Sequence, residues 1–181
     1  MQMLSRWFAL FIATSFLLTG CATVNPPPTV PQKVDLPRFM GDWYVVAGQL
    51  TWLEKEAYNG VETYELKEGG KIATTYTFRK GGFDGPVKTY HPSGYVFNRE
   101  SNAEWRMQFV WPFEAAYLIL FLDDEYRYTV IGEPGRKYLW IMARKPHIPD
   151  DVMKTILSHL EGIGYDVSKI KAMPQKWTES E

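Results

Sequence analysis

The chain has 181 residues, the size of one ordinary globular domain. Hydrophobic residues make up 45% of it, aromatic residues 15% and charged residues 23%, a balance that fills a core and excludes an intrinsically disordered chain. Twenty Lys and Arg against 21 Asp and Glu give a net charge of −1, so no basic surplus favours nucleic acid as a partner. A single cysteine excludes an internal disulfide and a multi-cysteine metal site.

Residues 1–20 have the pattern of a signal peptide rather than of folded structure. Arg6 is the only early charge, and an apolar run from Trp7 to Leu18 follows it. This run is too short to span a bilayer but suits the hydrophobic core of a signal peptide. The alternative is a core helix that ends in a buried cysteine, and it is disfavoured because a basic start, a short apolar run and small residues before Cys21 coincide.

The tetrad Leu18-Thr19-Gly20-Cys21 resembles the lipobox of bacterial lipoproteins. The resemblance implies that Cys21 is the lipid-attachment site, with a diacylglyceryl group on its sulfur and an acylated (palmitate-type) amino terminus after cleavage. Ala22, in place of an aspartate, then implies sorting to the outer membrane of a Gram-negative bacterium. Three acyl chains on one residue would anchor the protein stably, because a single chain binds a membrane only marginally.

A proline-rich segment follows the cysteine. Residues 22–34 contain four prolines, and they predict an extended spacer that is semi-rigid at Pro26-Pro27-Pro28. At about 3 Å per residue, this spacer would hold a domain roughly 40 Å from the membrane. The expected organisation is a signal peptide at 1–20, the lipidated Cys21 and spacer at 21–34, a folded domain at 35–177 and a tail at 178–181.

From Gly41 onward, short apolar and aromatic runs alternate with turn signals, the pattern of an all-β protein. Links rich in glycine and proline, such as Gly81–Pro86, separate the runs. The two runs on either side of His91-Pro92 are either one bent strand or two short ones. Because the links are short, the pattern predicts an eight-stranded antiparallel up-and-down barrel, whose closure removes exposed edges. The expected strands are 43–50, 61–66, 72–78, 87–90, 95–97, 105–110, 116–122, 126–131 and 138–144.

One C-terminal helix is expected at about 149–162. Pro149 suits its first position, and Asp150 and Asp151 place negative charge at the positive end of the helix dipole. The apolar residues of this segment recur at helical spacing, and Gly162 and Gly164 end it. We expect the apolar stripe to pack on the outside of the barrel. A role at a membrane surface is the alternative, but the polar face has no basic band.

Three short motifs resemble those of the lipocalins. Gly41-Asp42-Trp43-Tyr44 matches their G-x-W signature, and Asp35–Phe39 before it is similar to the helical turn that closes the base of their barrel. Only Asp123 and the nearby tyrosine of 122–126 fit the second motif, whereas Arg144 fits the third. The resemblance covers roughly residues 35–177. It implies that Trp43 plugs the closed end and that the guanidinium of Arg144 stacks on its indole and donates to backbone carbonyls.

Other segments narrow the resemblance to the bacterial lipocalins. They are 126–128, 138–141 and 164–169, together with the lipobox and the lack of disulfide cysteines.

The resemblance also implies a binding cavity, because an eight-stranded barrel has room for one small ligand. Side chains alternate along a strand, and in the lipocalins the face of Trp140 points inward, so Leu139 and Ile141 would meet the helix. The small residues Val45 and Ala47 share the parity of Trp43 and would leave space above it. The lining would suit a fatty acid or lysophospholipid. The alternative is that these rings fill a ligand-free core. The expected ligand-binding residues are Trp105, Met107, Phe109, Tyr117, Ile119, Phe121, Tyr138, Trp140 and Met142.

Two links carry apolar side chains that would lie at the mouth of such a barrel. Trp52, Leu53 and Tyr58 belong to the loop 49–60, and Trp111-Pro112-Phe113 forms another. They would form an apolar rim, a homodimer contact or a patch that touches the membrane. The sequence does not rank these three roles.

No catalytic or metal-binding pattern is present in the sequence. His91, His147 and His159 lack the spacing of a zinc site, and neither a nucleophile elbow nor a phosphate loop occurs. We therefore expect no cofactor and no enzymatic activity. The prediction is an outer-membrane lipoprotein that binds lipidic ligands for storage, transport or envelope maintenance. Two rivals remain: an envelope protein-interaction module with a filled barrel, and an enzyme with an inward titratable residue.

Overall fold

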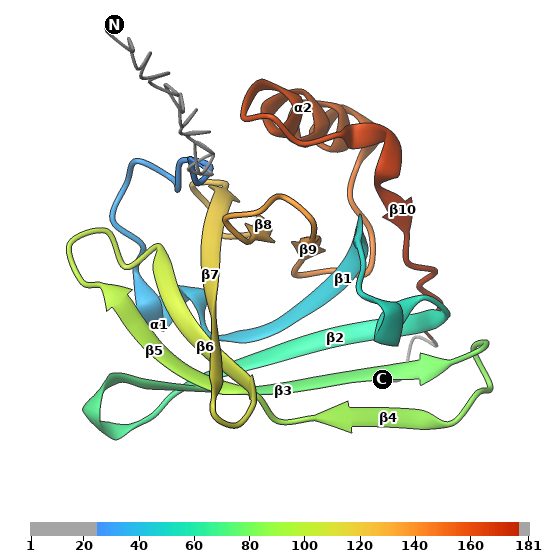
Figure 1. Ribbon diagram of the computed structural model, residues 1–181. Coiled ribbons are helices and arrows are strands. Elements are labelled where there is room, and N and C mark those ends of the chain that lie inside the picture. The colour runs from blue at the N-terminus through green and yellow to red at the C-terminus, as the bar shows by residue number, and fades with distance from the viewer. Residues whose placement is uncertain (1–24, 178–181) are drawn as a thin grey trace, which may run out of the picture.

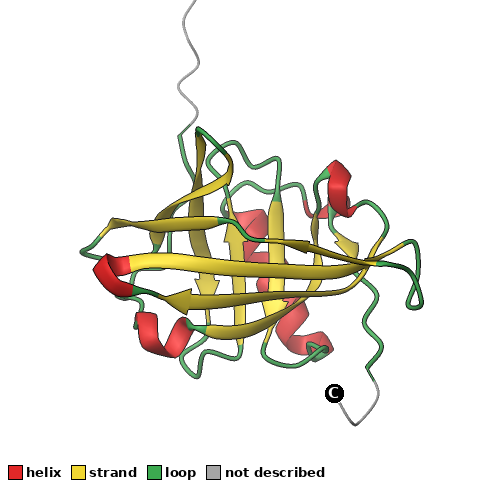
Figure 2. Ribbon diagram, turned by 90° about the horizontal axis from the view of Figure 1, so that it is seen from below, coloured by secondary structure: helices red, strands yellow, loops and turns green. Residues whose placement is uncertain are grey.

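In the computed structural model, which describes residues 25–177, antiparallel strands close into an eight-stranded barrel with one long helix on its outside (Figures 1 and 2). Each strand pairs with the next along the barrel, and β1 pairs with β9 to close it. The meander predicted from the short links is therefore the observed topology. The strands are β1 Gly41–Gln49, β2 Ala57–Leu66, β3 Lys71–Lys80, β4 Val87–Tyr90, β5 Ser93–Asn98, β6 Glu104–Val110, β7 Phe113–Leu122, β8 Tyr128–Gly132, β9 Leu139–Ala143 and β10 Lys171–Ala172.

Strands β4 and β5 together fill one of the eight positions. Both pair with β3, but only β5 continues to β6. The break falls at His91-Pro92, because proline has no N–H to donate to a neighbouring strand. The sequence left open one bent strand or two short ones, and the structure has two. The short β10 adds to β1 at Ala47 and Gly48.

Side chains alternate along β3, which is typical of a barrel with a packed interior. Ile72, Thr74, Tyr76 and Phe78 are buried, whereas the residues between them are partly exposed. The same alternation places Glu62 and Tyr64 of β2 inside.

Two register shifts change which residues face the interior. One lies between Val45 and Ala47 of β1, and the other between Ile119 and Phe121 of β7. An extra residue in one strand reverses the parity of everything beyond it. Ala47 and Phe121, both expected inside, therefore lie on the helix side of the sheet, and Leu122 points inward.

The helix α2, Asp150–Gly162, covers this outer face. Its buried residues Ile156 and Leu160 share a hydrophobic cluster with Leu139 and Ile141, as the alternation of the last strand predicts. Asp150 and Asp151 lie in its first turn, with Pro149 as the N-cap. A short helix α1, Leu36–Phe39, directly precedes β1 and lies at one end of the barrel. No helix within residues 25–177 is long and apolar enough to cross a membrane.

The segment before α1 packs on the barrel instead of standing away from it. Val30 and Val34 are buried, and their N–H groups donate to the carbonyls of Ile119 at 3.0 Å and Ser101 at 2.8 Å. Arg136 donates to the carbonyl of Asn25 at 2.8 Å. The spacer interpretation is therefore wrong for residues 25–34, and only four residue steps, at most about 14 Å, separate Asn25 from Cys21. Cys21 itself, the signal peptide 1–20 and the tail 178–181 lie outside the described residues.

Candidate ligand-binding site inside the barrel

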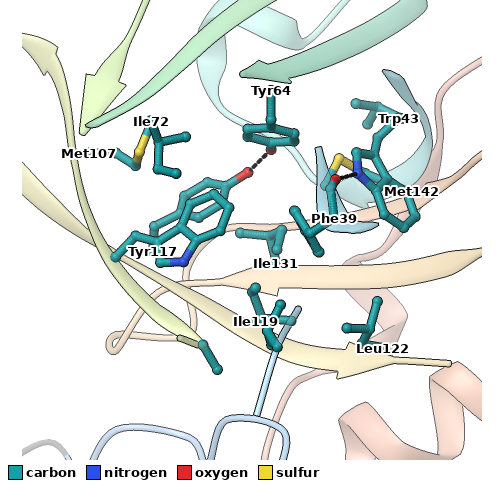
Figure 3. Packing of buried hydrophobic residues seen from close by; sticks show 14 of the residues in the cluster. Phe39, Trp43, Tyr64, Ile72, Met107, Tyr117, Ile119, Leu122, Ile131 and Met142 are labelled. Carbon is teal, nitrogen blue, oxygen red and sulfur yellow. Dashed lines mark hydrogen bonds between the residues drawn. The ribbon is translucent and has the colours of Figure 1, made fainter. Parts of the chain in front are cut away.

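Trp43 and α1 fill the closed end of the barrel. The Trp43 indole N–H donates to the carbonyl of Phe39 at 2.8 Å, and the two rings lie 5.1 Å apart (Figure 3). The side chain of Asp35 caps α1 by accepting from the N–H of Arg38. Gly41, which begins β1, has a φ of +89°, a conformation that favours glycine.

Arg144 stabilises the closed end of the barrel. Its guanidinium carbon lies 3.8 Å from the centroid of the Trp43 ring. Burial lowers the pKa of the guanidinium, which donates to five backbone carbonyls. These are Arg38 at 2.8 Å, Phe39 at 3.0 Å, Met40 at 2.8 Å, Asp42 at 2.8 Å and Tyr126 at 3.3 Å. The structure thus brings Gly41, Trp43 and Arg144 together. Asp123 shapes the neighbouring turn by accepting from the N–H groups of Arg127 and Tyr128.

A row of aromatic rings runs from the plug toward the open end. Trp105 contacts Phe39 edge-on at 5.4 Å and stacks on Tyr117 at 5.9 Å, and Tyr117 stacks on Trp140 at 6.3 Å. Met107, Ile119 and Met142, also expected inside, belong to the same buried cluster (Figure 3). Six of the nine expected residues therefore face the interior: Trp105, Met107, Tyr117, Ile119, Trp140 and Met142.

The other three expected residues lie elsewhere. Phe121 packs on His159 of α2 because of the register shift in β7, with ring centroids 5.8 Å apart. Phe109 lies near the end of β6 and Tyr138 directly precedes β9, and they are 55% and 39% exposed. Neither belongs to the buried interior.

Sequence reasoning missed a buried carboxylate in this interior. Glu62 of β2 pairs with Trp43 of β1, so it lies close to the plug. Its Oε2 accepts from the hydroxyl of Tyr117 at 2.9 Å and from that of Tyr64, and the two hydroxyls contact each other (Figure 3). Glu62 was detectable in principle, because it lies two residues from Tyr64 on one face of an expected strand.

Burial changes the acidity of this cluster. Loss of solvation raises the pKa of Glu62 to about 7, although the hydrogen bonds from Tyr64 and Tyr117 oppose the rise. Burial, together with the charge on Glu62, raises the pKa of both phenols well above the ordinary value. Both protonation states of Glu62 are therefore populated near neutral pH, whereas the phenols stay protonated.

Thr74 of β3 adds a hydroxyl without a partner. It lies opposite Tyr64 in the β2–β3 register and is buried. Its Oγ1 has no hydrogen-bond partner among the described residues. A buried polar atom without a partner costs stability, so such an atom inside a barrel indicates a site for a ligand or water.

A second carboxylate lies where the loop between β1 and β2 covers the open end. Glu54, in the short 3-10 helix Trp52–Glu54, is buried. Its Oε1 accepts from the Tyr76 hydroxyl at 2.9 Å and the Trp140 indole N–H at 2.8 Å. Its Oε2 accepts from Thr51, at 2.6 Å from the hydroxyl and 3.0 Å from the N–H. These contacts hold the loop on the barrel.

The same end of the barrel carries several exposed apolar residues. Trp52 and Trp111 are 79% and 80% exposed, and Phe113 is 74% exposed. Tyr58, which the sequence grouped with them, packs instead on Phe83 at 5.0 Å. Two surface hollows, of about 360 Å³ beside residues 33–37 and about 440 Å³ along α2, lie outside the barrel. Residues 25–177 contain no cluster of three or more acidic, histidine or cysteine side chains that could hold a metal ion.

An eight-stranded antiparallel barrel, closed at one end by a tryptophan–arginine stack and covered by one C-terminal helix, defines the lipocalin class of fold. The family model described as "Lipocalin-like domain" matches residues 34–175, and the chain belongs to this family.

Curated relatives include bacterial and plant proteins. The chain is 31% identical over 168 residues to "Outer membrane lipoprotein Blc" of Escherichia coli (strain K12), an alignment that covers 86% of this chain and 88% of that protein. It is 29% identical to "Temperature-induced lipocalin-1" of Arabidopsis thaliana, covering 84% and 85% of the two chains. The first relative supports the resemblance to the bacterial branch that the sequence indicated.

Solved structures share the fold at low identity. Insecticyanin from the tobacco hornworm Manduca sexta aligns with a TM-score of 0.63 and 16% identity, covering 86% of each chain. The cockroach allergen Per a 4 aligns with a TM-score of 0.64 and 16% identity, covering 84% of this chain and 95% of that one. These similarities concern the fold alone.

Proposed function

We propose that this protein is a lipid-anchored outer-membrane lipocalin that holds one elongated lipidic ligand inside its barrel, for lipid storage, transport or envelope maintenance. The aromatic row from Phe39 through Trp105 and Tyr117 to Trp140 carries the proposal. Such a row offers an alkyl chain a continuous apolar wall with a closed bottom and a lined entrance. Lysophospholipids and fatty acids are the ligand classes with the required shape.

The proposed location rests on the N-terminus and on the relatives. The lipobox ends at Cys21, and the bacterial relatives are named outer membrane lipoproteins. A lipid on Cys21 would keep the barrel close to the bilayer, because residues 25–34 are bound along the barrel. Anchoring of this kind raises the effective concentration of the binding site near lipid.

The test is native mass spectrometry of the chain from residue 22, which retains every described residue, purified without detergent. We expect one lysophospholipid or fatty acid per protein after titration. Trp140→Asp should remove the adduct while circular dichroism shows a folded barrel, because the charge lies in the aromatic row. Leu66→Asp, at an exposed position near the closed end, is the control and should bind normally. Failure of the wild type to take up either lipid would exclude the proposal.

The exposed rim favours a second candidate, an envelope module that binds a protein partner or a second copy through Trp52, Trp111 and Phe113. Absence of lipid adducts, combined with a dimer that Trp111→Ser dissociates, would support this candidate instead.

A further inference from the structure

Two buried carboxylates place negative charge in the interior of the barrel. Glu54 and Glu62 are the buried charged residues of the described chain, and no lysine or arginine between residues 25 and 177 is buried with them. Arg144 stacks on Trp43 and donates to five backbone carbonyls. An anionic group that entered the barrel would meet negative charge without a cation to balance it.

The two carboxylates differ in their capacity to accept further hydrogen bonds. Both oxygens of Glu54 are fully used by Thr51, Tyr76 and Trp140. In contrast, both hydrogen bonds to Glu62 end on Oε2, and no described group donates to Oε1. Glu62 is therefore the carboxylate that can accept from a ligand.

The free oxygen of Thr74 lies close to this acceptor. Glu62 and Thr74 are diagonal neighbours on the inner face of β2 and β3, because Thr74 pairs with Tyr64. Diagonal neighbours on a sheet are roughly 7–8 Å apart. Both side chains extend into the interior, and an ammonium group has three N–H donors to share between such acceptors. Rings of Trp105 and Tyr117 border the same space and attract cations through their faces.

We propose that Glu62, Thr74 and the Tyr64–Tyr117 hydroxyl pair form a subsite at the closed end of the cavity for the cationic amine end of an elongated ligand, and that this subsite disfavours carboxylate-ended ligands. The inference rests on the proposed function, which requires a ligand-sized space inside the barrel. The amine would enter first and the alkyl chain would follow along the aromatic row toward Trp140.

The preference should depend on pH. The groups that face Glu62 are Tyr64 on its own strand, Tyr76 on β3, Tyr117 on β7 and Glu54 from the loop. The phenols do not titrate near neutrality, and the raised pKa of Glu62, about 7, makes it the group that changes charge there. Attraction for an amine should rise between pH 6 and pH 8 as Glu62 loses its proton.

The experiment compares three ligands of equal chain length, namely decylamine, decanol and decanoate. Binding to the chain from residue 22 is measured by isothermal titration calorimetry below the micelle concentrations. At pH 8 we expect decylamine to bind at least about tenfold more tightly than decanoate, the effect of one hydrogen bond to a charged group. The ratio should narrow at pH 6.

Variants assign the preference to the cluster. Glu62→Gln keeps the shape and should bring decylamine and decanoate to within about threefold of each other, and Thr74→Val should weaken decylamine several-fold. Glu65→Gln, which removes an exposed carboxylate from the same strand, is the matched control and should change neither ligand.

Each result decides between the two proposals. Tight decanoate and decanol binding without a preference for decylamine would overturn the amine subsite and leave the lipid-binding proposal intact. An unchanged preference in folded Glu62→Gln would also overturn it. Failure of all three ligands and of lysophospholipid to bind would reject the cavity itself. If Glu62→Gln does not fold, the pH dependence of the wild type and the Thr74→Val result decide.

Discussion

The polar groups on the two sides of Trp43 differ in whether their hydrogen bonds are satisfied. Beneath Trp43, the guanidinium of Arg144 donates to five carbonyls and the indole N–H has its own acceptor. Above Trp43, Oγ1 of Thr74 has no partner in residues 25–177, and both hydrogen bonds to Glu62 end on Oε2. Saturated polar networks stabilise a fold, whereas buried unpaired atoms cost stability and need another reason to be present. The comparison separates a structural plug from the proposed binding chamber.

The largest expected effect comes from breaking the plug. Arg144→Leu removes one donor from each of five carbonyls and the cation from the Trp43 face. We expect a loss on the order of 4 kcal/mol in the free energy of unfolding, measured by urea denaturation. Arg127→Leu is the control: its side chain is exposed and pairs with Asp123 and Glu125, so it should cost about 1 kcal/mol or less. Equal losses in both variants would contradict the assignment.

Glu62→Gln tests the chamber through pH. The pKa of Glu62 rises from 4.5 to about 7 on folding, so the folded protein holds the proton more tightly than the unfolded chain. The contribution of Glu62 to stability should therefore be greatest below pH 4.5 and fall by roughly 3 kcal/mol as the pH rises through about 7. The variant should lose this slope and gain stability over the wild type at pH 8. Urea titrations at pH 5 and pH 8 measure the difference, and a slope that persists in the variant would disprove the prediction.

The same substitution at two buried threonines sharpens the comparison. Thr74→Val removes a hydroxyl without a partner and should stabilise the ligand-free protein by about 1 kcal/mol. Thr129→Val removes a hydroxyl that donates to the Phe121 carbonyl at 2.9 Å and should destabilise it by about 1 kcal/mol. Thermal or urea unfolding of both variants shows whether the two effects have opposite signs. Effects of the same sign would mean that Thr74 is satisfied in solution.

The smallest effect on stability is expected at the rim. Trp111 is 80% exposed, so Trp111→Ser should change the free energy of unfolding by less than about 0.5 kcal/mol. Sedimentation with phospholipid vesicles then tests whether the rim touches membranes, and weaker binding of the variant would support that role. A large loss of stability would show that Trp111 is packed in solution.

Much of the closed end and of the architecture followed from the sequence. Gly41 and Trp43 lie in one short motif, Arg144 directly follows β9, and the helix shows in its period and its flanking residues. Each of these signals is local and needs no knowledge of the partner strand.

The residues that line the barrel interior could not all be predicted from the sequence. The prediction that Phe121 points inward was wrong, because the register shift in β7 depends on how the neighbouring strands pair. Residues 25–34 appeared as a free spacer because proline-rich sequence does not reveal the backbone groups of Ile119 and Ser101 that it pairs with.

The sequence by itself determined the strand and helix pattern, because that pattern depends on local periodicity and turn residues. Its short motifs carried the family resemblance, and the resemblance implied the plug. Only the tertiary structure decided which polar atoms meet inside the barrel. Glu54 and Trp140 are 86 residues apart in the chain, and Tyr64 and Tyr117 are 53 apart. Barrel closure and strand register bring them together, and neither is encoded in any short segment.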